Sequence, residues 1–513
     1  MSKETIAKNT VFLYFRMILT MLVSLYTSRV ILQVLGIDDF GIYQTVGGVV
    51  ALLSFINTAL SAGSSRFLTF ELGRNDTEKL RKTFSSVLIV HIALALIVVF
   101  AAETAGLWFV YNKLVIAPNR LDAAVFALHF SVVTIFFTIT QVPYNASIIS
   151  HERMSVYAYL SILEVCLKLA VVYLLQIAEW DKLKVYAVLL CIVQIGIALS
   201  YRLYCKCKFS ECRATLSFDK AIVKDVLNYS SWNLLTNTAA AAVVHGTTVL
   251  TNMFFNPSVV AARAIANQLN GAASQLVNNF RNAVNPQIIK RLANDDLNGS
   301  KRLLLVSTKI SFFLMLLLCV PACLVADSLL FLWLGFIPEH SVAFLRLALV
   351  TALFQTLSQS FYTALYAKGQ IRENAIYTSA FGFVTIGMIY ILFKCGFSAV
   401  SLAWCMLVEE ILLAFVVKSY LIVKIADYKW SDVWNVNLSC MKVALIALPI
   451  PLVTFFVVST ESVNEYVRFL VMVLLSVLSV CVSVWFFGLT QEMKIFIMQI
   501  FEKFKRKVSP RLN

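Results

Sequence analysis

The chain has 513 residues, of which 60% are hydrophobic and 14% are charged, and its mean hydropathy is +0.80. These values lie outside the range of soluble globular domains and indicate an integral membrane protein. The formal charge of +15 does not imply nucleic-acid binding, because the basic residues alternate between loops as membrane orientation requires.

Apolar stretches of about 20 residues, long enough to cross roughly 30 Å of hydrocarbon, recur along the chain. We expect about fourteen such spans, all helical. They are 11–34, 42–63, 84–110, 123–142, 156–177, 185–204, 230–253, 262–285, 303–326, 342–365, 376–394, 398–421, 440–459 and 466–488. An even number puts both termini on one side, and most of the loop Lys and Arg residues share that side. Both termini are therefore expected in the cytoplasm.

The two halves of the chain resemble each other. A shift of about 220 residues aligns the loop "LGRNDTEKLRKT" (72–83) with "LANDDLNGSKRL" (292–303), and the corner at Gly36 with the corner at Asn256. We expect an N-terminal six-helix lobe in 1–215, a parallel second lobe in 216–438, two further helices in 439–489 and a basic amphipathic tail in 490–513, which would contact anionic lipids. Parallel repeats of this kind form two bundles that handle substrate between them, which is a transporter architecture.

Polar residues follow one face of several expected spans. The eighth, "ARAIANQLNGAASQLVNNFRNAVNP", carries six polar residues at steps of three or four: Arg263, Asn267, Asn270, Ser274, Asn278 and Arg281. The other seams are Thr20, Ser24, Thr27 and Ser28 in the first span, Asn233, Asn237 and His245 in the seventh, and Ser358, Gln359 and Tyr362 in the tenth. Such a seam must face protein or water, and hydrogen bonding between helices is its ordinary role.

Cations within the spans indicate a functional site more strongly than the polar seams do, because an Arg or Lys near the bilayer centre costs about 2.5–3.5 kcal/mol. Lys168 can pair with Glu164, whereas Arg346 lies near a span end, where its side chain can reach the interface. The predicted substrate-binding residues are Arg16, Arg29, Asn237, Arg263, Asn267, Asn278, Arg281 and Arg346. Carboxylates are fewer there, so the site suits an anionic sugar-bearing substrate, whose phosphate oxygens match arginine. On a helical wheel Arg29 points about 170° from the seam of its own span, so the sequence does not decide whether Arg29 faces the substrate cavity.

The stretch "YTSRVILQVLGIDDFGIYQ" (26–44), together with "NTALSAGSSRF" (57–67) and "VPYNASIISHERM" (142–154), resembles bacterial polysaccharide transporters. These are Wzx-like oligosaccharide flippases of the multidrug, oligosaccharidyl-lipid and polysaccharide (MOP) exporter superfamily, which includes the MATE transporters. The resemblance implies two six-helix lobes plus two helices. It also implies a place in the bacterial cytoplasmic (inner) membrane and alternating access for an undecaprenyl-diphosphate-linked oligosaccharide, such as an O-antigen unit of lipopolysaccharide. Arg16, Arg29, Arg263 or Arg281 would meet the diphosphate.

Other functions remain open. A peptidoglycan lipid flippase moves the same kind of lipid, but the expected Arg-Asp pair is absent because Val30 follows Arg29. A drug antiporter would be expected to keep an acid in its N-terminal lobe, and a glycan polymerase needs a large outer catalytic loop. No catalytic, nucleotide-binding or metal-binding motif occurs, so we expect a transporter with no cofactor and no metal. Coupling to H⁺ or Na⁺ and contact with polysaccharide polymerase machinery are left open.

Overall fold

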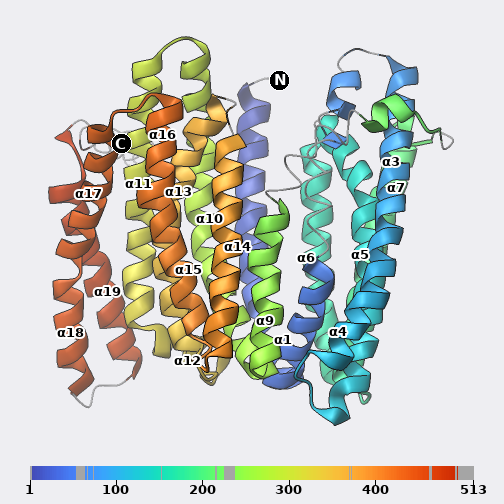
Figure 1. The fold of residues 1–513 in the computed structure, drawn as a ribbon, viewed down its shortest axis with the longest axis horizontal. Helices are drawn as coiled ribbons and strands as arrows, with labels where there is room; N and C mark the ends of the chain where they lie inside the picture. The colour runs from blue at the N-terminus through green and yellow to red at the C-terminus, as the bar shows by residue number, and fades with distance from the viewer. Residues whose placement is uncertain are drawn as a thin grey trace, which may run out of the picture. The chain divides into compact units, whose positions relative to one another are not determined.

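A computed structural model describes residues 3–52, 64–65, 67–72, 74, 76–151, 153–213, 217–224, 237–368, 370, 372–460, 465–491 and 494. Within these ranges the chain forms helices and no strands, which confirms the expected all-α fold (Figure 1). Ten helices of this part are long and apolar enough to span a membrane, so the chain is a multi-pass membrane protein.

Four of the about fourteen expected spans do not appear separately among these ten. The spans 42–63 and 230–253 fall partly outside the described residues. The helix over 262–285 is rich in Asn and Arg, while 398–421 carries Glu409, Glu410 and Lys418 and is interrupted by a π-helical turn. Polar and charged side chains therefore explain why these two stretches are not among the ten apolar helices.

The chain divides into two compact units, and unit 1 comprises 1–268, 338–341 and 375–405. Its helices are α1 (Lys3–Ala51), α3 (Thr77–Ala101), η2 (Ala102–Gly106), α4 (Leu107–Asn112), η3 (Pro118–Arg120), α5 (Leu121–Ser150), α6 (Met154–Ile177), α7 (Lys182–Lys208), η4 (Glu211–Arg213), η5 (Ala242–Gly246), α9 (Thr247–Phe254), the start of α10 (Pro257–Ala293), most of α14 (Arg372–Lys394) and the start of α15 (Ser401–Leu412). Helix α5 packs against α7, α3 and α1. Val46, Leu128 and Leu183 lie in the resulting apolar core.

Unit 2 comprises 269–337, 342–374 and 406–513. It holds the rest of α10 and α15, with α11 (Leu297–Leu324), α12 (Ala326–Leu334), α13 (Ser341–Ala367), η6 (Leu413–Lys418), α16 (Ser419–Ala426), α17 (Trp430–Ala447), α18 (Pro449–Thr460), α19 (Glu465–Ser483) and η7 (Val484–Gly488). Helix α11 packs against α19 and α17, and Leu304, Phe361 and Val433 lie in a buried apolar cluster. The expected lobe boundaries at 215, 438 and 489 stay predictions.

The corner predicted in the first helix is present at Gly36. This residue has φ 80° and ψ 168°, a backbone conformation that is open essentially only to glycine, and it bends the long helix α1. Gly41 follows, and a Cβ placed there would lie 1.9 Å from the carbonyl oxygen of Pro257. Pro257 begins α10, where proline fits because the first helical N–H needs no partner. The two glycines therefore allow α1 to bend and to touch the start of α10.

Candidate functional site

Arg281 of α10 is the centre of a polar cluster in unit 2. Its Nη1 atom donates to Asn278 Oδ1 at 3.1 Å and to Gln359 Oε1 of α13 at 2.5 Å. Its Nε atom is buried and has no hydrogen-bond partner among the described residues. No carboxylate pairs with Arg281 among the residues that the structure describes. The guanidinium group therefore keeps its charge beside neutral amides.

The cluster continues along α13 and onto α14, α15 and η6. Ser358 donates to the carboxylate of Glu410, and Lys418 donates to the side-chain oxygen of Asn374. The Lys418 ammonium also lies 5.5 Å from the centre of the Tyr362 ring, an attractive cation–π distance. The sequence singled out Ser358 and Tyr362, and the structure joins their seam to that of Arg281. The contacts of Lys418 were missed, although a charge inside an apolar span is the signal that could have found it.

Arg263 occupies a different place in unit 1, near the start of α10. Its side chain is buried, and its Nη2 and Nη1 atoms donate to the hydroxyls of Thr247 at 2.6 Å and Thr248 at 3.3 Å. Asn267, one turn later, is exposed, and Asn237 is partly buried. The α10 seam is thus divided, because Arg263 and Arg281 belong to different compact units.

The polar seam of α1 lines a cavity in unit 1. Ser24, Thr27 and Ser28 face a space of about 270 Å³ that Lys168 of α6 and Tyr186 of α7 also line. Lys168 pairs with Glu164 at 2.7 Å, as its spacing predicts. The buried hydroxyl of Thr27 has no hydrogen-bond partner in the part of the chain that the structure describes, so a polar group is available at this cavity.

The remaining predicted cations differ from one another. Arg29 is partly buried, and no described residue bonds to it or pairs with it. Arg346 donates to Asp327 Oδ2 at 2.7 Å and to the Cys323 carbonyl at 2.9 Å, so it has a counter-charge of its own. The side chain of Arg16 lies outside the described residues.

Arg202 of α7 is a cation that the sequence reasoning missed. Its Nη2 atom donates to the Thr140 hydroxyl at 2.5 Å, and its guanidinium lies 5.5 Å from the Phe137 ring centre. Its Nε atom is buried and finds no partner within the described ranges. Arg202 is followed closely in the sequence by Lys206 and Lys208 near the end of α7, and its distant partners give no local signal. Each unit therefore contains an arginine whose hydrogen-bond partners are neutral.

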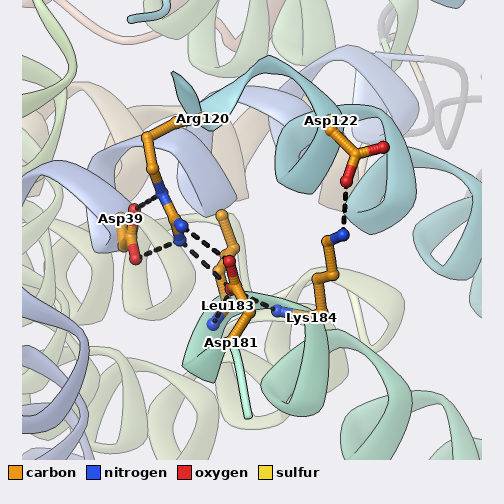
Figure 2. Close-up of polar contacts among 6 residues, drawn as sticks. All are labelled: Asp39, Arg120, Asp122, Asp181, Leu183 and Lys184. Atoms are coloured by element: carbon orange, nitrogen blue, oxygen red, sulfur yellow. Dashed lines mark hydrogen bonds and ion pairs between the residues drawn. The ribbon is translucent and has the colours of Figure 1, made fainter. Parts of the chain in front are cut away.

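A charged network lies at the Gly36 corner of unit 1 (Figure 2). Arg120 donates from Nε and Nη2 to the two Asp39 oxygens at 2.8 and 2.5 Å, and from Nη1 to Asp181 Oδ2 at 2.6 Å. Asp181 Oδ1 accepts from the backbone N–H groups of Leu183 and Lys184, which caps α7. Partial burial alone would raise the pKa of Asp181, but the hydrogen bonds from Arg120 and the α7 backbone outweigh it and lower that pKa below its usual value.

Several solved structures share this fold. The lipid II flippase MurJ in an inward closed conformation matches with a TM-score of 0.71 and 12% sequence identity, covering 92% of this chain and 97% of that one. An inward-facing multidrug resistance MATE transporter of the MOP superfamily matches at 0.68 and 14%, covering 79% and 95%. The MATE multidrug transporter DinF-BH matches at 0.60 and 14%, covering 83% and 96%. No protein-family model and no curated protein matches the chain. The chain therefore shares the fold of these MurJ and MATE transporters.

Proposed function

We propose that this chain is a flippase that carries an undecaprenyl-diphosphate-linked oligosaccharide across the bacterial cytoplasmic membrane by alternating access. The fold supports a transporter, since its neighbours include a lipid II flippase and multidrug exporters. The observation that carries the substrate class is the hydrogen bonding of Arg281, whose partners are amide oxygens.

A guanidinium group has five N–H donors, and an ion in a membrane helix is expensive unless another charge or strong hydrogen bonds offset it. Among the described residues Arg281 uses only its Nη1 atom, on Asn278 and Gln359. Its Nη2 donor, and its buried Nε donor after a rearrangement that exposes it, match the paired oxygens of a phosphate group, which would supply the missing counter-charge. A diphosphate lipid fits this requirement, and a cationic drug does not.

The position of Arg281 along α10 supports capture from the cytoplasmic leaflet. The helix continues to Lys290 and Arg291, which the loop charges assign to the cytoplasmic side. We propose that Arg281 receives the diphosphate there, while Arg202 acts as a second anion-binding cation in unit 1. Arg16, Arg29, Asn237, Arg263, Asn267 and Asn278 remain proposed as residues met by the same substrate, and Arg346 would join them only by leaving Asp327.

Two alternatives share the fold. A peptidoglycan lipid flippase would use the same diphosphate chemistry and would rescue cells depleted of their own lipid II flippase. A cation-coupled drug exporter is favoured by one observation, the Glu410 carboxylate that accepts from Ser358 within a span of unit 2. It would raise drug resistance without changing surface glycan.

The test is export of lipid-linked repeat units in cells that lack their own polysaccharide flippase. The parent is compared with Arg281→Ala, Arg281→Lys and Arg202→Ala at matched membrane abundance. Loss of charge-assisted hydrogen bonds is expected to slow export by the Arg281→Ala variant about tenfold or more, with lipid-linked oligosaccharide accumulating on the inner leaflet. Arg281→Lys keeps the charge but not the paired geometry, so its export rate should fall between those of the parent and Arg281→Ala.

Arg74→Ala is the matched control, because Arg74 is an exposed residue that lies 3.9 Å from Glu71. It should export like the parent. Full export by Arg281→Ala would show that the diphosphate is held elsewhere. Rescue of lipid II transport without surface glycan would replace the proposal with the peptidoglycan alternative.

A further inference from the structure

The bend at Gly36 creates a cavity of about 760 Å³ in unit 1, which we call the corner cavity. It is lined by residues 35–39 and Ile42 of α1, by residues 115–117, 119 and 120, and by Asn256 and Pro257. The volume lies within the roughly 300–1,000 Å³ typical of sites for small molecules. The corner cavity is separate from the Arg281 cluster, whose residues all belong to unit 2.

The walls of this cavity are fixed by contacts within unit 1. The Asn252 side chain accepts from the backbone N–H of Val115 at 2.9 Å and donates to its carbonyl oxygen at 3.4 Å, which holds the 115–120 segment against α9. Arg120 binds Asp39 and Asp181, as Figure 2 shows. Asn256 Oδ1 accepts from the backbone N–H of Val259 and so caps α10. The cavity is therefore preformed.

The polar groups that face the cavity have unused hydrogen-bonding capacity. Asp38 and Asn119 are exposed, and their side chains make no hydrogen bond to another described residue. Asn256 uses its oxygen on Ser258 and Val259, while its amide N–H groups have no acceptor among those residues. Carboxylate and amide groups of this kind bind adjacent hydroxyls, because each hydroxyl both donates and accepts. Leu35, Ile37 and Ile116 add apolar walls that suit the C–H faces of a sugar ring.

The charge of the corner selects among sugars. Asp38 and Asp39 line the cavity together with Arg120, and Arg120 also shares its charge with Asp181, which is not a lining residue. Lys184 is paired with Asp122 and does not line the cavity. The cavity is therefore net negative, so it repels phosphate and uronate groups and favours neutral or amino sugars. Arg281, in contrast, attracts anionic groups such as phosphate.

We propose that the corner cavity binds a neutral or amino sugar of the transported glycan through Asp38, Asn119 and Asn256. The proposal rests on the proposed function, because the transported glycan supplies the sugar. It assigns the diphosphate and the glycan of the substrate to different residues. The diphosphate is met by arginines with neutral partners, and the glycan is met by carboxylate and amide groups at the corner.

The test is saturation-transfer NMR on the purified full-length protein in detergent, with methyl β-glucoside, glucosamine and glucuronate as probes. The first two are expected to bind in the millimolar range and glucuronate is not. Asp38→Ala and Asn119→Ala each remove hydrogen bonds, so each should weaken binding of the first two probes about 2- to 10-fold. Asp38→Asn removes the charge but keeps the hydrogen bonding, so it should increase binding of glucuronate.

Asp122→Ala is the matched control, because Asp122 is an exposed carboxylate of the same region that lies outside the cavity. It should bind the probes like the parent. Equal binding by the parent, Asp38→Ala and Asn119→Ala, or preferential binding of glucuronate by the parent, would overturn the proposal. Loss of export by Arg281→Ala tests the proposed function separately, because that assay needs no measurement of sugar binding.

Discussion

Arg120 of unit 1 and Arg281 of unit 2 are two partly buried arginines with different surroundings. Arg120 lies between the carboxylates of Asp39 and Asp181, so its charge is neutralised within the protein. Arg281 lies between the amides of Asn278 and Gln359, so its charge is not neutralised by the described residues. Arg346, paired with Asp327, resembles Arg120. The partner, more than the depth of burial, therefore separates a structural cation from one that can receive an anionic ligand.

Gly41→Ala should destabilise the corner of unit 1 more than any other variant proposed here. The added Cβ would lie 1.9 Å from the Pro257 carbonyl oxygen, so α1 and α10 must separate. Overpacking of this kind costs about 1–3 kcal/mol, or more where backbone has to move, and we expect a value at the upper end of that range. Thermal unfolding in detergent, followed by size-exclusion chromatography, measures the loss.

Gly47→Ala is the matched control in the same helix, because a Cβ at Gly47 meets nothing within 4 Å. Alanine is favoured over glycine inside helices, so this variant should unfold at the same temperature as the parent or higher. Equal stability of the two variants would mean that the contact between Gly41 and Pro257 does not constrain the corner.

Arg120→Ala is the next largest expected effect. It leaves Asp39 and Asp181 facing each other without a cation. Removing one partner from a fully buried ion pair costs about 3–5 kcal/mol. We expect about 2 kcal/mol here, because solvent screens side chains that are 18–28% exposed.

The same variant predicts a pH dependence. The pKa of Asp181 is lowered in the folded chain, so the carboxylate stabilises the fold above its unfolded pKa of about 3.9. That stabilisation is lost as the pH falls through the lower, folded pKa. The stability difference between the parent and Arg120→Ala should therefore be complete at pH 7 and shrink below about pH 4. A difference that stays constant across this range would contradict the assignment.

The sequence predicted local features well. Hydropathy predicted the membrane helices, the Gly36 corner and the Asn256 corner both exist, and the spacing of Glu164 and Lys168 predicted their ion pair. These features depend on residues a few positions apart, where helix geometry fixes what can touch. The number of separately recognised spans was harder to predict, because polar helices such as α10 lack a strong apolar signal.

Features that depend on distant partners were missed. Arg120 finds Asp39 and Asp181 at separations of 81 and 61 residues, and Arg202 finds Thr140 at 62. The sequence identified the seams of α10 and α13, but only the fold joins Arg281 to Gln359, 78 residues away. Counting cations within spans therefore yields candidates, and their partners decide which of them keep an unneutralised charge.

Arg281→Met tests whether Arg281 stabilises the fold as Arg120 does. We expect it to change stability less than Gly41→Ala and Arg120→Ala do. Methionine keeps much of the apolar volume, while removal of a charge without a counter-charge relieves a desolvation penalty. Asn278 and Gln359 lose a donor, which offsets part of that gain. We expect the free energy of unfolding to change by less than about 1 kcal/mol, although export is lost. If thermal unfolding instead showed a loss as large as that of Arg120→Ala, Arg281 would be a structural brace for α10 and α13, and its neutral partners would no longer mark a ligand site.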